Sequence, residues 1–173
     1  MHTSKVLSYS RLLNTILSFL GIMLSVYAVY VEVKKEEDSD YVALCDITEI
    51  ISCSKVFSTK YAKGFGVIGP IFGEESILNQ PNGIYGTACY IILLILSQVR
   101  WTRAAHAQLL LVVLCNCTTP YLAYLLYKVI KAVCVLCLAT YAVNFSLLLV
   151  ALWRRTALLE VQDKRTGRLA KRE

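Results

Sequence analysis

Residues 132–153 read AVCVLCLATYAVNFSLLLVALW, a run without a charged side chain. A helix of about 20 residues crosses the roughly 30 Å hydrocarbon core of a bilayer, so this run predicts a transmembrane span. Three further runs avoid charge in the same way, at 12–31, 84–99 and 106–127. With 57% hydrophobic residues and a mean hydropathy of +0.56, the chain is too apolar for an ordinary soluble domain. We therefore expect an all-α membrane protein, a four-transmembrane-helix bundle.

Charged residues indicate how the bundle is oriented. The formal net charge is +6, but the basic residues flank the apolar runs and are not interleaved with exposed aromatics, which argues against a nucleic-acid partner. Segment 32–83 carries five Lys and nine Asp or Glu, a net charge of −4. Under the positive-inside rule both termini are cytosolic and segment 32–83 is lumenal or external. The basic flanking residues are Lys5, Arg11, Arg100, Arg103, Arg154 and Arg155, together with those of the tail after 155.

The first apolar run could instead be a signal peptide, because Val26, Tyr27 and Ala28 form a passable cleavage site. The run 12–31 is longer than a usual signal-peptide core and is followed directly by charges. We therefore interpret it as a membrane anchor.

The lumenal segment is expected to cap the bundle. Apolar positions within 41–58 have the period of a short amphipathic helix. The glycine-rich stretch 64–72 contains large apolar side chains, so we expect it to be a lid over the helices or buried against lipid. The predicted catalytic domain is then 1–155, and 156–173 is a frayed cytosolic tail.

Cys134 and Cys137 form the most informative motif. Positions three apart on a helix share a face, with Cα atoms about 5 to 6 Å apart, which allows a reversible disulfide. Lys131 lies one turn earlier and, with the helix N-terminus, favours the nucleophilic thiolate. A structural disulfide is the alternative. Zinc is disfavoured because His2 and His106 both fall on the opposite side of the membrane.

The other cysteines divide into a second pair and three scattered residues. Cys45 and Cys53 lie in the lumenal segment, where they are either a structural clamp or a dithiol that relays electrons to the first pair. We interpret Cys89, Cys115 and Cys117 as packing residues within the second and third spans.

Two polar residues of the predicted spans are candidates for binding a substrate. Tyr141 lies one turn after the cysteine motif, and Asn82 enters the second span at the lumenal edge. Their structural alternatives are a hydrogen bond within the bundle for Tyr141 and a helix cap for Asn82. The sequons at Asn116 and Asn144 lie within predicted spans and are discounted.

These motifs together resemble one family. They are the pair Cys45 and Cys53, the run CSKVFS at 53–58, KGFG at 63–66, LNQPN at 78–82, and CVLC at 134–137 followed by Thr140 and Tyr141. The combined pattern resembles the vitamin K epoxide reductases, nearest to the animal endoplasmic-reticulum branch with its VKOR-like paralogue. It covers roughly residues 8–155.

The resemblance implies a four-helix bundle around a quinone pocket. It implies an enzyme that reduces vitamin K 2,3-epoxide to the quinone and the quinone to the hydroquinone, in the membrane of the endoplasmic reticulum. Cys137 would attack the substrate and Cys134 would resolve the adduct. Cys53 would exchange with Cys134, and Cys45 would receive electrons from a lumenal thioredoxin-fold protein. The resemblance implies no metal and no tightly bound cofactor.

The same resemblance assigns the pocket. Asn82 and Tyr141 would hydrogen-bond the two quinone oxygens, Phe57 would pack beside the ring, and coumarin anticoagulants would occupy the same space. Thr59, where animal relatives usually carry serine, keeps a hydroxyl and is counted with the substrate-binding residues. Tyr61 stands where they usually carry tryptophan, so altered lid contacts are expected.

Two other functions compete with this one. The same machinery could run toward oxidation, with a quinone accepting electrons so that lumenal proteins gain disulfides, as bacterial relatives do. Alternatively, the chain could be a non-catalytic tetraspan scaffold held by structural disulfides.

Overall fold

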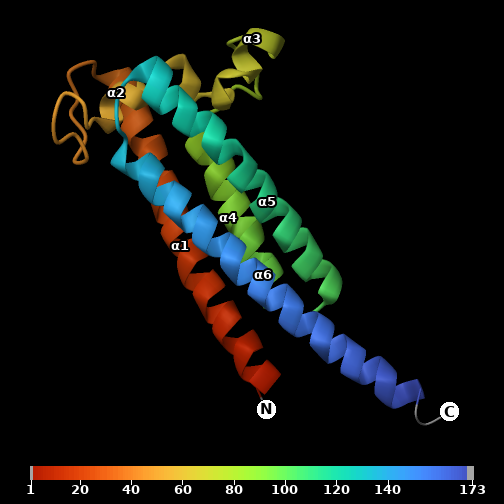
Figure 1. Cartoon of the computed structure of the whole chain (residues 1–173). Coiled ribbons are helices and arrows are strands. Elements are labelled where there is room, and N and C mark those ends of the chain that lie inside the picture. The colour runs from red at the N-terminus through yellow and green to blue at the C-terminus, as the bar shows by residue number, and fades with distance from the viewer. Residues whose placement is uncertain (1, 171–173) are drawn as a thin grey trace.

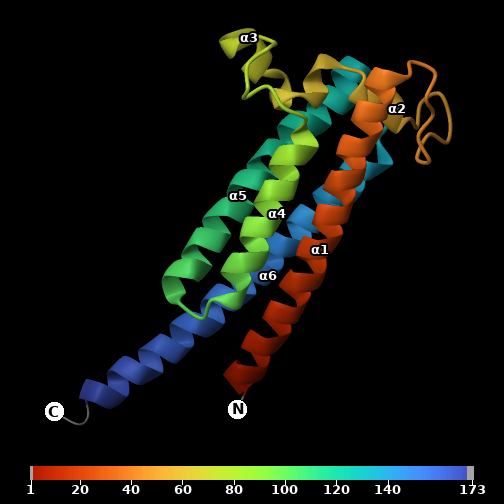
Figure 2. The same ribbon diagram turned by 180° about the vertical axis from the view of Figure 1, so that it is seen from behind.

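The computed structural model describes residues 2–170, which form helices and, within that range, no β-strand. Its long helices α1, α4, α5 and α6 lie side by side as a bundle, and the short helices gather at one end (Figures 1 and 2). The elements in chain order are α1 (His2–Glu37), α2 (Cys53–Phe57), the 3₁₀ turns η1 (Lys60–Ala62) and η2 (Gly64–Gly66), α3 (Ile68–Phe72), α4 (Asn82–Gln98), α5 (Thr102–Tyr124), the π-helical stretch η3 (Leu125–Ile130) and α6 (Val135–Ala170).

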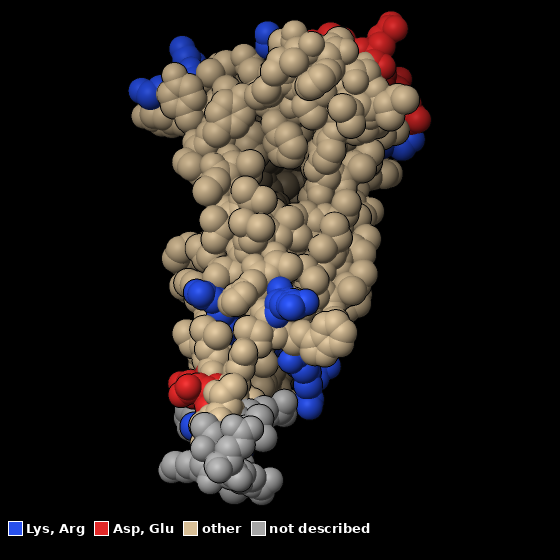
Figure 3. Space-filling model, turned by 90° about the vertical axis from the view of Figure 1, so that its right-hand side faces the viewer, with Lys and Arg blue, Asp and Glu red and all other residues tan. Residues whose placement is uncertain are grey.

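Three of these helical stretches are long and apolar enough to cross a membrane: Lys5–Glu37, Thr102–Ile130 and Val135–Lys164. Helix α4 is apolar but shorter, with 17 residues. Figure 3 shows charged side chains toward the two ends of one face and a wide uncharged band between them, with a hollow in the band. The helical bundle is thus confirmed, and the span count of four stays a prediction.

Helices α1 and α4 approach each other closely because small residues lie at their contact. A Cβ atom on Gly83 would lie 2.6 Å from the backbone oxygen of Ser25, and one on Gly21 would lie 2.6 Å from the ring of Tyr90. Small residues permit such close backbone packing between membrane helices. This contact places the start of α4 directly against α1.

A buried polar network joins the four long helices at the end of the bundle away from α2. The Arg154 guanidinium of α6 is 1% exposed and donates to the Gln108 side chain of α5. It also donates to the carbonyl oxygens of Leu96 and Val99, where α4 ends. Gln108 in turn donates to Asn14 Oδ1 of α1 over 2.5 Å. Arg154 is therefore more than the flanking charge expected from the sequence, because it binds the C-terminal end of α4.

The prediction of an amphipathic helix across 41–58 is wrong. Only Cys53–Phe57 is helical, and the residues before it form turns. The turns form because side chains bind the local backbone: Thr48 Oγ1 accepts from Ile51 N over 3.0 Å, and Asp46 accepts from Ala43 N over 2.9 Å. Such bonds compete with helical ones.

The glycine-rich stretch caps the bundle only in part. Phe65 lines a cavity described below, whereas α3 stands apart from the bundle (Figure 1) and its Ile71 and Phe72 are 65% and 64% exposed. Phe65 itself has a φ of 57°, between Gly64 and Gly66, which also have positive φ values. Glycine tolerates these values, so the tight turn depends on the sequence GFG.

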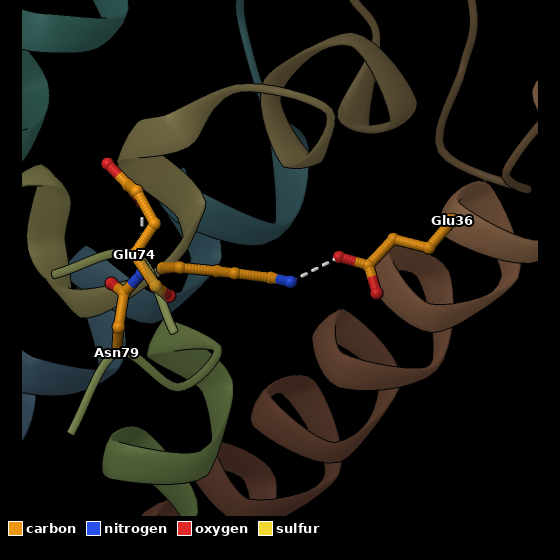
Figure 4. A network of polar contacts seen from close by, with 4 residues as sticks. Glu36, Glu74 and Asn79 are labelled. Atoms are coloured by element: carbon orange, nitrogen blue, oxygen red, sulfur yellow. Dashed lines mark hydrogen bonds and ion pairs between the residues drawn. The ribbon is translucent and has the colours of Figure 1, made fainter. Parts of the chain in front are cut away.

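An ion pair ties this cap to α1. Lys63 Nζ lies 2.5 Å from Glu36 Oε1, and Figure 4 shows the contact beside Glu74 and Asn79, whose amide donates to Glu74 O over 2.9 Å. The hydrogen bond that Lys63 donates to the Glu36 carboxylate is the main reason that the pKa of Lys63 is raised. Because both side chains are partly exposed, the pair contributes less than about 1 kcal/mol and mainly fixes where the cap lies.

The end of the chain also differs from expectation. The tail predicted to be frayed from residue 156 continues α6 as a helix through Ala170. Residues 171–173 of the predicted tail lie outside the described residues.

Candidate functional site

Cys45 and Cys53 form a disulfide with Cα atoms 5.9 Å apart. Cys53 is the first residue of α2, whose N-cap is Ser52, and the Ser52 hydroxyl accepts from Lys55 N over 3.1 Å. Cys53 is fully buried, whereas Cys45 is half-buried in the turn before it. The disulfide therefore has one sulfur facing the protein interior and one near the surface.

Asp46 holds this disulfide in place. Its carboxylate accepts from Ser54 N over 3.0 Å, from the Ser54 hydroxyl and from Ala43 N over 2.9 Å. Burial raises the pKa of Asp46, but the hydrogen bonds from Ser54 and Ala43 outweigh it and leave the pKa below its ordinary value of 3.8.

We expect Asp46→Asn to lower stability by about 1 kcal/mol or more, because an amide has a single acceptor oxygen for three donors. A lowered folded pKa means that this stability is present above the unfolded pKa of about 4 and is lost as pH falls through the folded value. Unfolding of the purified protein followed from pH 7 to pH 3 would show the wild type converging on the variant at low pH. The exposed Asp40→Asn serves as control, and a constant difference between wild type and variant at every pH would contradict the assignment.

Cys134 lies next to this disulfide. Its sulfur is 3.6 Å from the sulfur of Cys53, and both residues are fully buried. A short backbone bridge makes the contact: Val133 N donates to Ile50 O over 2.7 Å, and Ser52 N donates to Val133 O over 3.0 Å. Cys53 and Cys134 come directly after the bonded residues Ser52 and Val133 in the sequence, so this bridge sets the distance between the two cysteines.

The CVLC motif lies at the start of α6, where the candidate membrane-spanning stretch Val135–Lys164 begins. Cys134 precedes the first helical residue, Val135, and its sulfur accepts a hydrogen bond from Cys137 N over 3.2 Å. Both thiols are free. The expectation of two sulfurs on one continuous helix is therefore wrong in detail. The physical reason is that Lys131 adopts a left-handed conformation with φ 54°, which ends the preceding π-helical stretch.

Cys137 opens onto a cavity of about 310 Å³ between the cap and the long helices. The four residues expected to bind substrate, Asn82, Tyr141, Phe57 and Thr59, all line it. Other lining residues are Ser25, Tyr61, Phe65, Tyr85, Cys89, Tyr90, Cys115, Leu122, Leu126, Thr140 and Asn144. A mostly apolar wall with a few polar groups is what a lipid-soluble ligand requires.

Asn82 ties the cap to α4. Its Oδ1 accepts from Phe65 N and its Nδ2 donates to Tyr61 O, each over 2.7 Å. It is the first residue of α4, whose N-cap is Pro81, so it does not cap its own helix. One N–H of its amide remains to donate into the cavity.

The other three expected residues differ in what they can offer. The Thr59 hydroxyl donates to Val56 O over 2.8 Å, so its proton is used within the cap. The Tyr141 hydroxyl has no hydrogen-bond partner among residues 2–170. Phe57 adds an apolar side chain to the wall of the cavity that Cys137 also lines.

Two features of the cavity wall were not predicted from the sequence. Asn144, discounted as a sequon, lines the cavity and accepts from the Tyr90 hydroxyl over 2.8 Å. Its position three residues after Tyr141 on one helix face was the available signal. Cys89 and Cys115, interpreted as separate packing residues, bring their sulfurs within 2.9 Å of each other.

One set of side chains in the described part of the chain has the spacing of metal ligands: Cys45, Asp46 and Cys53. Both of its sulfurs are joined in the disulfide. A metal ligand must be a free thiolate, so in this state the set fits a disulfide and not a metal.

Known proteins are similar to this chain over most of its length. A sequence model described as the vitamin K epoxide reductase family matches residues 12–152. The chain is 38% identical over 139 residues to the rat protein named vitamin K epoxide reductase complex subunit 1, which covers 80% of this chain and 86% of that protein. It is 36% identical over 140 residues to the mouse protein of the same name, covering 81% and 87%.

Proposed function

The chain belongs to the vitamin K epoxide reductase family, and from that premise we propose that it reduces vitamin K 2,3-epoxide and vitamin K quinone through Cys134 and Cys137. The chain is thus an enzyme of the vitamin K epoxide reductase type. The observation that carries the proposal is the path of sulfurs from Cys45 through Cys53 and Cys134 to Cys137, which ends at the cavity.

Each reduction consumes two thiols. The Cys137 thiolate attacks the ring, and Cys134 displaces the ring to form the Cys134–Cys137 disulfide. The epoxide gives up its oxygen as water and becomes the quinone, and in a second round the quinone takes two electrons and two protons to become the hydroquinone. Donors around the ring would stabilise the negative charge that develops on its oxygens, in a cavity whose wall is mostly apolar.

Three polar groups are placed to donate to those oxygens. Asn82 has a spare amide hydrogen beside the cap, and Tyr141 has a hydroxyl without a protein partner in the described chain. Asn144 contributes an amide deeper in the same cavity. Coumarin-type inhibitors, which also carry ring oxygens, would compete for the same donors.

The lumenal pair would restore the dithiol by exchange. Reduced Cys53 attacks Cys134, which frees Cys137. Cys45 then attacks Cys53, which frees Cys134 and leaves the Cys45–Cys53 disulfide. The structure contains this last state, with the lumenal pair oxidised and Cys134 and Cys137 free. A dithiol donor of the lumen, such as a thioredoxin-fold protein, would reduce the more accessible Cys45.

This function fits a protein of the endoplasmic-reticulum membrane with both termini cytosolic and segment 32–83 lumenal. The lumen is oxidising, so disulfides can form there. Its test is direct: purified protein in detergent, supplied with vitamin K 2,3-epoxide and dithiothreitol, should release quinone and then hydroquinone with one dithiol oxidised per step. Absence of quinone from folded protein would reject the proposal. Oxidation of lumenal substrates at the expense of added quinone would favour the reverse direction.

Replacing Asn82 by aspartate is expected to raise KM for the epoxide about tenfold or more. The change puts a carboxylate oxygen against the carbonyl of Tyr61, which loses its donor. The cap then detaches from α4 and the cavity loses one donor. Steady-state kinetics would show the effect, with the exposed Gln80→Ala as control. Unchanged KM together with unchanged kcat would refute this role.

A further inference from the structure

Cys89 and Cys115 lie face to face in the cavity wall. Cys89 belongs to α4 and Cys115 to α5, and their sulfurs are 2.9 Å apart. Both are half-buried, and both line the cavity onto which Cys137 opens. Cys117, two residues further along α5, is exposed and does not line that cavity. The contact thus concerns two particular cysteines that the cavity shares.

This separation is close to that of a bond. A disulfide places its sulfurs about 2.05 Å apart, so the pair needs to approach by roughly 0.9 Å. The two sulfurs come from different helices, so closing the bond would join α4 to α5 beside the ligand space. No thiol step of the proposed reaction uses either residue.

A quinone held deep in the cavity would reach this pair. Cys89 lies seven residues beyond Asn82 on α4, and Asn144 lies seven residues beyond Cys137 on α6, each a distance of about 10 Å along the helix. The hydroxyl of Tyr90, the neighbour of Cys89, donates to Asn144 Oδ1 over 2.8 Å, and Cys89, Tyr90 and Asn144 all line the cavity. A ring oxygen that accepts from the Asn144 amide would therefore place the ring beside these two sulfurs.

We infer that Cys89 and Cys115 are a second redox-active dithiol of the cavity, which reduces a bound quinone directly. Two S–H bonds break and one S–S bond forms between α4 and α5. The two electrons and two protons pass to the quinone, whose two carbonyl groups become hydroxyl groups. The inference uses the quinone of the proposed function but neither Cys134 nor Cys137.

The test counts electrons in the absence of added reductant. Purified protein in detergent is reduced with dithiothreitol, freed of it under anaerobic conditions and incubated to completion with excess vitamin K1, whose quinone ring has no C–H position at which a thiol could form a lasting thioether. Each dithiol can reduce one quinone. With the pairs 45/53, 134/137 and 89/115, the wild-type chain should give about three hydroquinones, and Cys89→Ser/Cys115→Ser should give about two. Peptide mapping should find residues 89 and 115 cross-linked after the quinone and not before it. The control Cys117→Ser should match the wild type.

A further variant separates this inference from the proposed function. Cys134→Ser/Cys137→Ser disconnects the lumenal pair from the cavity, so about one hydroquinone per chain and the 89–115 cross-link should remain. If that variant forms the cross-link while the wild type releases no quinone from epoxide, the proposed function fails and the inference stands. The inference would be overturned if wild type and Cys89→Ser/Cys115→Ser gave equal yields of hydroquinone per chain and the wild type gave no 89–115 cross-linked peptide. The peptide measurement on the wild type decides this even if the double variant folds poorly.

Discussion

Cys137→Ala is expected to lower epoxide reduction at least about a thousandfold, to the level of the buffer reaction. Cys137 is the one sulfur of the Cys45–Cys53–Cys134–Cys137 path that lines the cavity. Without it no thiolate on that path can attack a ring held there, and Cys134 is fully buried and cannot substitute. Turnover of epoxide with dithiothreitol, followed by chromatography of the products, gives the measurement.

The neighbouring variants sharpen this result. Cys134→Ala leaves Cys137 able to attack but removes the thiol that displaces the ring, so a covalent adduct of substrate on Cys137 should accumulate and be seen by intact-protein mass spectrometry. Cys117→Ala, which changes an exposed cysteine, should retain activity. Substantial epoxide turnover by Cys137→Ala would contradict the proposed chemistry. A scaffold, by contrast, would show no turnover in any of the three variants.

The second large effect concerns stability. Arg154→Ala should destabilise the bundle by about 3 kcal/mol or more, because it leaves the Gln108 side chain and two carbonyl oxygens of α4 without their donor inside the protein. The network spans four helices, so its loss should also weaken the contact of α4 with α6.

Unfolding by heat or denaturing detergent would measure this loss. Arg103→Ala is the matched control, since Arg103 is exposed and should change stability by less than about 0.5 kcal/mol. Arg154→Lys should fall between the two, because an ammonium group keeps the charge but does not provide the planar fork that reaches three acceptors. Equal stability of Arg154→Ala and Arg103→Ala would show that the buried guanidinium contributes little.

Apolar runs predicted the helices well because burial in lipid requires a long uninterrupted stretch. Helix α4 (Asn82–Gln98) begins and ends within two residues of the predicted run 84–99, and α5 with η3 contains 106–127. Helix α6 differs in extent from the apolar run 132–153, since it begins at Val135 and continues far beyond residue 153. Charge marks where a helix leaves the hydrocarbon, but a helix continues in water when its residues favour it.

The site was predictable where it depended on residue type and not where it depended on contacts between distant segments. The four residues expected around the substrate do line one cavity with Cys137. The turn structure around Asp46 was missed, because its hydrogen bonds to Ser54 cross eight residues and outweigh the apolar periodicity of 41–58. The contact of Cys89 with Cys115 depends on how α4 packs against α5, which local sequence does not encode.

The complete burial of Cys134 affects which thiols a chemical probe can reach. Its sulfur is completely enclosed, whereas Cys137 borders the open cavity. An electrophilic compound that diffuses in from the lipid phase will therefore meet only one thiol of the motif, and a single alkylation there would block the proposed reduction. An irreversible inhibitor would therefore combine a flat apolar ring with an electrophilic group directed at Cys137. Water-soluble maleimides should leave Cys134 and Cys137 unmodified until the cap is opened.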